Sequence, residues 1–319
     1  MWPGLSAQSQ QPPTEAAPLR VEVRLVNVDV AVTDPAGKFL PELTTHNFRL
    51  LEDGTPQEIA HFAPTRAPVR ILLLVEASPA VFLIRGEHLA AAHALLRHLR
   101  TEDEAALASY SRSVHPQAEF TRDKNYIHNQ LLRVTQFGLE MAEMNLLDAV
   151  AETLDRMSPP PQRTAVLIIG TGLDSGSKAR WEELEQRIGA SQITFFAIAT
   201  GRLLMGKSEK ESNGVGAAFA EADARLRALA EASAGQAYFP ESFEELERDY
   251  GQIAERLRNV YSLGYYSAQK DRDGRYRAIR VELVDETSAA LELRPEGSGR
   301  GRSFRPRVYA RPGYFAPRD

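Results

Sequence analysis

The chain of 319 residues contains no cysteine. This absence excludes a disulfide framework, thiolate metal sites and cysteine nucleophiles, but it does not identify the compartment. No run of about 18 apolar residues is present, so no segment is expected to span a membrane as a helix. The 38 basic and 43 acidic residues give a net charge of −5. This balance argues against nucleic acid as a partner.

Signatures of several common enzyme classes are also missing. The sequence has no G-x-S-x-G elbow, no Walker-type loop and no dinucleotide fingerprint. His88, His93 and His98 are five residues apart, and each such step rotates about 140° round a helix, so these side chains are not expected to converge. They do not form an H-E-x-x-H motif and are predicted to be surface or half-buried residues.

The first 18 residues are rich in Gln, Pro, Ser and Ala, which predicts a flexible leader. They lack the apolar region of a secretory signal, although Leu5 to Gln8 resemble the end of one. Composition therefore leaves exported and cytosolic locations both open.

The most informative segment is the apolar run from Ile71 to Val75, which ends in Glu76 and Ser78. Such a run predicts a parallel strand covered on both faces. Its carboxyl end then carries a carboxylate and a hydroxyl at the edge where open α/β sheets bind ligands.

Around this segment, residues 68–262 alternate apolar strands with helical stretches, the pattern of a doubly wound α/β sheet flanked by helices. The strands are predicted at Val69–Val75, Ala105–Tyr110, Thr164–Ile169 and Ile193–Ile198. The helices are predicted at Val81–Leu99, Lys124–Val134, Leu146–Met157, Ala179–Ile188, Ala217–Ala232 and Ser242–Leu257. The polar segment 206–214 is interpreted as a solvated connection rather than a binding loop.

The two ends of the chain carry β patterns. Residues 20–33 alternate apolar and polar side chains, and Asp53-Gly54 is a strong hairpin signal. Strands are expected at 20–33, Phe48–Glu52, Gln57–Phe62, Tyr265–Ser267, Tyr276–Val284, Ala289–Leu293 and Val308–Phe315. Together they predict a β-sandwich-like domain formed by both termini, with the α/β domain inserted. The predicted division is a leader at 1–18, β-domain parts at 19–66 and 263–319, and the α/β domain at 67–262.

Two further C-terminal features have structural interpretations. The segment Asp271 to Gly274 resembles the start of a calcium loop but lacks the required Glu, so a hairpin turn between the strands at Tyr265 and Tyr276 is preferred. Tyr261, Tyr265, Tyr266 and Tyr314 form an aromatic-rich set, for which core packing is preferred over sugar or peptide recognition.

Over roughly residues 20–317 the chain resembles the VWFA-related domain family common in acidobacterial exported proteins. The N-terminal matches are Val28, Val30, Val32, Thr33, Asp34, Gly37, Leu43, Phe48, Leu50, Glu52, Asp53, Gly54, Gln57, Ile59 and Phe62. The C-terminal matches are Leu257, Arg258, Tyr261, Leu263, Gly264, Tyr265, Ala310, Arg311, Gly313, Tyr314 and Phe315. The resemblance implies a von Willebrand factor type A domain framed by a β-domain, and an exported location.

Type A domains hold a divalent cation with a D-x-S-x-S motif, a threonine and a further aspartate. Here the first three positions read Glu76, Ser78 and Ala80, while Met144 stands in the threonine position and Thr171 in the aspartate position. A thioether is a poor ligand for a hard ion such as Mg²⁺. The resemblance therefore implies a degenerate site with no metal cofactor.

Without a cation, a partly buried Glu76 must be exposed, protonated or paired, and Thr171 or Ser78 is expected to donate a hydrogen bond to it. Asp174 is a carboxylate that a metal could recruit. Asp148 lies at a helix start, where dipole stabilisation and amide capping are the preferred roles.

The sequence thus predicts a non-enzymatic, exported protein-interaction module whose partner is another protein; it does not determine the oligomeric state. The partner crevice would comprise Glu76, Ser78, Ala80, Met144, Thr171 and Asp174. One alternative is a Mg²⁺-dependent adhesion module using Glu76, Ser78 and Asp174. A second is a hydrolase with Glu76 and Asp174 as its carboxylate pair.

Overall fold

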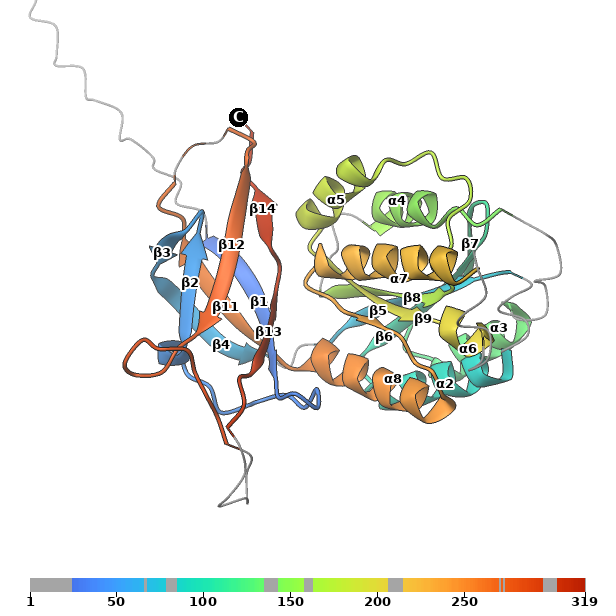
Figure 1. The fold of residues 1–319 in the computed structure, drawn as a ribbon, viewed down its shortest axis with the longest axis horizontal. Coiled ribbons are helices and arrows are strands. Elements are labelled where there is room, and N and C mark those ends of the chain that lie inside the picture. The colour runs from blue at the N-terminus through green and yellow to red at the C-terminus, as the bar shows by residue number, and fades with distance from the viewer. Residues whose placement is uncertain are drawn as a thin grey trace, which may run out of the picture.

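A computed structural model describes residues 25–65, 68–78, 85–134, 143–157, 163–205, 215–269, 271, 273–294 and 303–318. The predicted leader, Ala80 and the segment 206–214 lie outside these residues. Figure 1 shows two lobes, a β-sandwich built from both ends of the chain and an α/β lobe built from its middle. Within the described residues, no helix combines the length and the apolar character needed to cross a bilayer.

The α/β lobe is organised on a six-stranded sheet with the order β10-β9-β8-β5-β6-β7. All neighbours are parallel except β6 and β7. The strands are β5 (Arg70–Glu76), β6 (Glu104–Tyr110), β7 (Val114–Thr121), β8 (Thr164–Gly170), β9 (Ile193–Ala199) and β10 (Ala237–Tyr238). Every residue of β8 is buried, as expected of a central strand covered on both faces. The α/β fold predicted for the middle of the chain is confirmed.

Helices cover both faces of this sheet (Figure 1). One apolar layer joins the sheet to α2 (Arg85–His98), α3 (Lys124–Val134) and α8 (Phe243–Arg258). The other joins it to α4 (Leu146–Met157), α5 (Trp181–Ala190) and α7 (Val215–Glu231). The predicted bounds of α3 and α4 are confirmed to the residue, and those of α5, α7 and α8 lie within two residues of the structure. Residues 81–84 of the helix predicted at Val81–Leu99 lie outside the described residues, and α2 is described from Arg85 to His98. The short helix α6 (Gly201–Met205) was not predicted.

The edge strand β7 was also missed. Its sequence, VHPQAEFT, alternates non-polar and polar residues, but Pro116 stands inside the pattern. A proline cannot donate to a strand ladder, so its presence argues against a central strand. Here β7 pairs with β6 alone, at the edge of the sheet, where a proline is tolerated.

The sandwich consists of two four-stranded sheets, ordered β13-β1-β11-β4 and β14-β12-β2-β3. They contain β1 (Leu25–Thr33), β2 (Phe48–Glu52), β3 (Thr55–Gln57), β4 (Ile59–Thr65), β11 (Val260–Tyr266), β12 (Tyr276–Leu283), β13 (Arg307–Ala310) and β14 (Gly313–Phe315). Since β1 pairs with both β11 and β13, the two ends of the chain form one domain, as predicted. Asp53 and Gly54 have positive φ values of 47° and 80°. Both central residues of a type I′ hairpin turn need positive φ, so the turn that the sequence indicated is present.

Several predicted strands of the sandwich need correction. Residues 57–62 are not one strand, because β3 and β4 belong to different sheets. Residues 308–315 are divided in the same way into β13 and β14, and Pro312, which lacks an amide hydrogen, lies at the break. Residues 289–293 form only isolated bridges to Val284 and Phe304. The predicted hairpin turn near Asp271 is also wrong, since β11 and β12 lie in different sheets and are joined by an inter-sheet loop.

Glu52 lies fully buried between the two sheets of the sandwich. The Tyr265 hydroxyl, from the opposite sheet, donates to its Oε2. The Tyr314 hydroxyl donates to the same oxygen at 3.1 Å, and the Ser267 hydroxyl donates to Oε1 at 2.6 Å. These three donors compensate for the burial of the carboxylate. Of the predicted tyrosine set, Tyr261 and Tyr265 are core residues, whereas Tyr266 is 47% exposed.

The sandwich contacts the amino-terminal edge of the α/β sheet. The chain enters β5 shortly after β4, and only Asn259 separates α8 from β11. Arg163 pairs with Asp29 at 3.6 Å, and Gln252 Nε2 donates to the carbonyl of Ala36 at 3.1 Å. The carboxyl ends of the parallel strands therefore face away from the sandwich.

We expect Tyr265→Phe to lower the free energy of unfolding by about 1 to 3 kcal/mol, because it leaves the buried Glu52 carboxylate with one donor fewer. The matched control is the neighbouring Tyr266→Phe, which removes a hydroxyl from an exposed ring and should change stability by less than about 0.5 kcal/mol. Urea denaturation of both variants measures the difference. Equal effects would show that the hydroxyl bonded to Glu52 has no special role in stability.

Candidate functional site

The site begins at the last residue of β5, where Glu76 lies between two neighbouring strands. β6 ends beside it in Tyr110, and β8 ends beside it in Gly170, followed by Thr171. The carboxylate is 2% exposed. The predicted position at the carboxyl edge of the sheet therefore corresponds to the structure, but the side chain points into the protein instead of lining an open surface.

Four donors satisfy the Glu76 carboxylate. Ser78 Oγ donates to Oε1 at 2.7 Å, and Thr171 donates to Oε2 twice, from its backbone amide at 2.5 Å and from its hydroxyl at 2.8 Å. Tyr110 adds a longer bond to Oε2 at 3.4 Å. The expectation that Ser78 or Thr171 donates to Glu76 is met by both residues. Tyr110 was not foreseen, because only the pairing of β5 with β6 brings its ring beside Glu76.

Gly170 gives the carboxylate its space. A Cβ atom at this position would lie 2.5 Å from Glu76 Oε2 and 2.8 Å from the Tyr110 hydroxyl, both closer than real contacts allow. A glycine at the end of β8 therefore permits Glu76 and Tyr110 to meet over the backbone. The apolar run that ends in Gly170 was visible in the sequence, but the reason for the glycine was not.

Burial shifts the acidity of both groups. It raises the pKa of the Glu76 carboxyl, while the hydrogen bonds from Ser78, Thr171 and Tyr110 oppose that rise. Burial and the neighbouring Glu76 raise the pKa of the Tyr110 hydroxyl well above its usual value. Tyr110 therefore remains a neutral donor at physiological pH.

Asp174 is committed to the backbone of another loop. Its Oδ2 accepts from the amide of Leu147 at 2.9 Å, in the first turn of α4, and its Oδ1 accepts from Ser177 at 3.1 Å. Met144 is buried, and its amide donates to Ser175 Oγ at 3.0 Å. The two loops that carry Met144 and Asp174 are therefore fastened to each other.

Asp148 does bind amides, although not those of its own helix. Its carboxylate accepts from Lys178 at 2.9 and 3.1 Å and from Ala179 at 2.7 Å, just before α5. Its position in the first turn of α4 is as predicted and favours that helix dipole. The predicted capping of α4 is instead carried out by Asp174, whose Oδ2 accepts from the amide of Leu147.

A divalent cation does not fit this set of side chains. Oε1 and Oε2 of Glu76 already accept donors, and the Ser78 and Thr171 hydroxyls are directed at the same carboxylate. Met144 adds a thioether, which suits a hard ion poorly. Over the described ranges, no group of three or more His, Asp or Glu side chains is gathered as ligands. A cation here would have to displace the internal hydrogen bonds of Glu76.

The predicted site residues thus fall into two groups. Glu76, Ser78 and Thr171 form one buried cluster, to which the structure adds Tyr110. Asp174 bonds to the amides of Leu147 and Ser177. Met144 is buried, and a hydrogen bond to Ser175 joins its loop to that of Asp174. Ala80 lies outside the described residues. Glu76 and Asp174 have no hydrogen-bond donor in common among the described contacts, so the carboxylate pair of the hydrolase alternative has no shared network.

His93 and His98 on α2 have different surroundings, and the side chain of His88 lies outside the part of the chain that the structure describes. His93 is half-buried and contacts His128 of α3 with ring centroids 4.6 Å apart, whereas His98 is exposed. Burial and the nearby His128 lower the pKa of His93. His93 is therefore expected to be neutral and to contribute to the packing of α2 on α3.

No family model matches the chain, and no curated protein matches it in sequence. Among solved structures, BatB from Bacteroides thetaiotaomicron has 11% identity and a TM-score of 0.44, covering 59% of this chain and 98% of BatB. An aerotolerance-related membrane protein from Bacteroides fragilis has 13% identity and a TM-score of 0.46, with the same shares covered. The PilB minor pilin from Streptococcus sanguinis has 9% identity and a TM-score of 0.43, covering 61% of this chain and 62% of the pilin.

We expect the unfolding free energy of the protein to fall, relative to that of Glu76→Gln, as the pH rises above about 4.5. A raised pKa means that the folded state keeps the Glu76 proton after the unfolded chain has lost it, so stability decreases until the folded carboxyl ionises. The slope should not exceed about 1.4 kcal/mol per pH unit, the limit for one proton.

Glutamine suits this comparison because its carbonyl oxygen can take the Thr171 donors while its amide donates to the Ser78 hydroxyl. Urea denaturation of both proteins between pH 4 and 8 (about the range in which a carboxyl and its shifted form ionise) gives the difference curve, in which other titrating groups cancel. A difference that stays constant over this range would mean that the Glu76 pKa is not raised.

Proposed function

We propose that the chain is an exported, non-enzymatic protein-interaction module of the von Willebrand factor type A kind, with residues 67–262 as the interaction domain. The observation that carries this proposal is the internal satisfaction of Glu76, 2% exposed and bonded by Ser78, Thr171 and Tyr110. A carboxylate with these hydrogen bonds stabilises the carboxyl edge of the sheet, where type A domains bind their partners. Because the side chain is enclosed, it is also shielded from a substrate or a cation in solution.

This arrangement favours the interaction module over both alternatives. A general acid or base must reach its substrate, and Glu76 is enclosed. A metal-dependent adhesion site needs open oxygen ligands, whereas Asp174 is engaged by the amides of Leu147 and Ser177. Both alternatives require the internal bonds of this edge to break before the site can act.

The proposed partner surface is the rim of the carboxyl edge of the sheet. Arg112 and Glu143 form a 3.3 Å ion pair there, with side chains 72% and 57% exposed. Ser175 and Gly176 are exposed on the adjoining loop, which hydrogen bonds with Met144 and Asp174 hold in place. A rim of mixed charge on rigid loops suits another protein.

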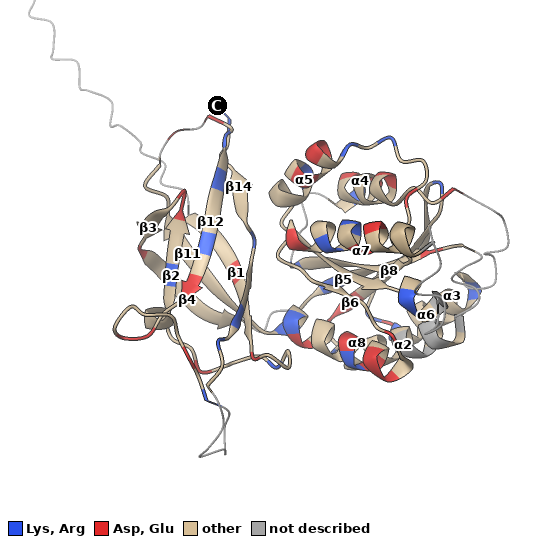
Figure 2. Cartoon of the chain, in the orientation of Figure 1, with Lys and Arg blue, Asp and Glu red and all other residues tan. Residues whose placement is uncertain are grey.

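The distribution of charge supports a protein partner over nucleic acid. In the view of Figure 2, acidic and basic residues are interspersed on α7, on α8 and on the strands of the sandwich. Nucleic-acid binding requires a continuous basic stripe.

We expect no saturable rise in melting temperature when Mg²⁺, Mn²⁺ or Ca²⁺ replaces EDTA. A ligand at about 100 times its dissociation constant would add roughly 2.7 kcal/mol to the native state, so a working site would be evident. Glu76→Gln should give the same flat response. A rise of several degrees in the unmodified protein that disappears in Glu76→Gln would restore the metal-dependent alternative.

The partner surface can be tested with a photoreactive amino acid placed at Arg112 in cells that make the protein. The matched control position is Arg280, which also lies in an exposed ion pair, 3.2 Å from Glu282, but on the sandwich. We expect a discrete protein adduct from the Arg112 position, competed by excess unlabelled protein, and none from Arg280. Equal labelling at both positions, or an adduct that competition does not reduce, would contradict the proposed surface.

A further inference from the structure

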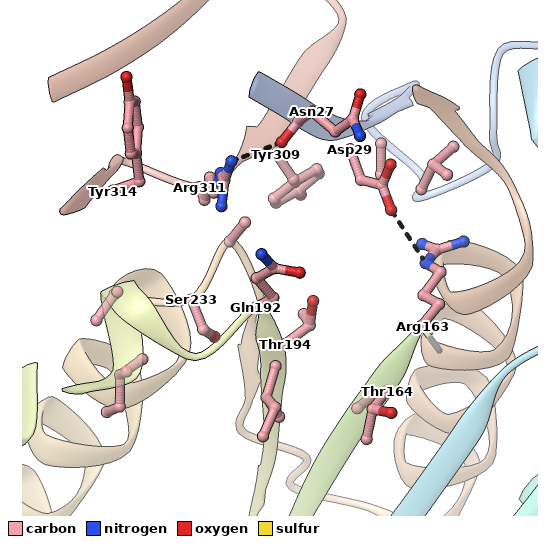
Figure 3. A pocket seen from close by; sticks show the side chains of 18 of the residues that line it. Asn27, Asp29, Arg163, Thr164, Gln192, Thr194, Ser233, Tyr309, Arg311 and Tyr314 are labelled. Carbon is pink, nitrogen blue, oxygen red and sulfur yellow. Dashed lines mark hydrogen bonds and ion pairs between the residues drawn. The ribbon is translucent and has the colours of Figure 1, made fainter. Parts of the chain in front are cut away.

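A cleft of about 570 Å³ lies between the two lobes, at the amino-terminal edge of the α/β sheet. One wall belongs to the sandwich and includes Asn27, Asp29 and Arg311, while the facing wall includes Arg163 and Gln192. In Figure 3 the Arg163 and Arg311 side chains enter the gap from opposite lobes, with Gln192 extending between them. This volume is in the range of small-molecule sites.

The charged groups of this cleft do not balance. Its lining contains the three arginines Arg163, Arg256 and Arg311 but only one acidic residue, Asp29, which leaves an excess of two positive charges. Asp29 pairs with Arg163 at 3.6 Å. No carboxylate contributes to the electrostatic surroundings of Arg256 among the described residues.

Two of these guanidinium groups also have an unused donor. Arg311 Nη2 donates to the carbonyl of Asn27 at 2.6 Å, and Arg163 Nη2 donates to the carbonyl of Arg256 at 3.3 Å. The atoms Arg163 Nη1 and Arg311 Nε are buried and have no hydrogen-bond partner in the described part of the chain. Arg256 itself donates to Gln236 Oε1 and to the carbonyl of Ala234, and it interacts with the Tyr238 hydroxyl. Buried donors of charged groups are normally paired, so the free donors of Arg163 and Arg311 indicate a missing acceptor.

The most enclosed of the three is Arg256, which is 4% exposed. Its guanidinium carbon lies 3.6 Å from the ring centroid of Tyr309 on the sandwich and 5.0 Å from that of Phe196 on β9. These contacts hold the guanidinium group between the lobes, where it is removed from water. The loss of hydration lowers the pKa of Arg256. A guanidinium nevertheless stays charged at neutral pH.

We propose that this cleft binds a small oxyanion carrying about two negative charges, either a phosphoryl group or a dicarboxylate, held chiefly by Arg163 and Arg311. The planar fork of arginine matches the oxygens of both groups. Such an anion neutralises the charge excess, accepts the unused donors and joins the two lobes. The inference is independent of the proposed partner surface, which lies at the opposite edge of the sheet.

The test uses thermal melts and isothermal titration calorimetry of the full chain with inorganic phosphate, with succinate and with chloride, all at constant ionic strength. We expect a saturable rise in melting temperature with phosphate or succinate and none with chloride. Binding of phosphate alone assigns a phosphoryl ligand, binding of succinate alone assigns a dicarboxylate, and binding of both leaves the oxyanion class as proposed.

Arg163→Gln and Arg311→Gln should each weaken binding by at least about tenfold, the loss expected for one charge-assisted contact. Arg133→Gln is the matched control, because it removes one positive charge from an exposed position on α3 and should leave affinity unchanged. Arg163→Lys retains the charge without the fork and covers the case in which Arg163→Gln does not fold. Equal responses to all three anions, or equal affinity in the cleft variants and Arg133→Gln, would overturn the proposal.

Discussion

The burial of a carboxylate at the end of a central strand is the constraint on which the rest of the α/β lobe depends. An ionised carboxyl removed from water is costly unless donors compensate for it. Glu76 is 2% exposed, and its compensation comes from the strand ends on either side, Tyr110 from β6 and Thr171 after β8. The burial of Glu76 therefore depends on the register of β5 with β6 and β8 and on the glycine at position 170.

The sandwich also contains a buried glutamate that accepts hydrogen bonds from hydroxyl groups. Glu52 is fully buried and accepts from the hydroxyls of Tyr265, Ser267 and Tyr314, which come from both sheets. In each lobe a single glutamate thus joins separate strands through neutral donors. Hydroxyls add no charge, so the contacts of each carboxyl with these groups are hydrogen bonds and not ion pairs. The cleft between the lobes is different, because its arginines outnumber the acidic groups that line it.

Much of this architecture could be predicted from particular segments. The run ILLLV ends where a central strand was expected, and α3 and α4 begin and end at the predicted residues. The predictions failed where sequence patterns are weak or misleading. The alternating pattern of the edge strand β7 contains Pro116, which argues against a strand. Residues 57–62 and 308–315 form continuous β patterns although the chain changes sheets within each. A change of sheet depends on which surfaces pack together, and that is not encoded in a local period.

The sequence by itself determined the class of the fold, because the spacing of apolar residues decides which faces of strands and helices can be buried. Its resemblance to type A domains implied that Glu76, Ser78 and Thr171 stand where those domains carry metal ligands. Only the tertiary structure decided what these residues do with one another. Glu76 and Thr171 are 95 positions apart and meet because β5 pairs with β8, so a hydrogen bond between them is a property of the strand order and not of any segment. The arginine cleft likewise exists only because the two ends of the chain fold together against the amino-terminal edge of the sheet.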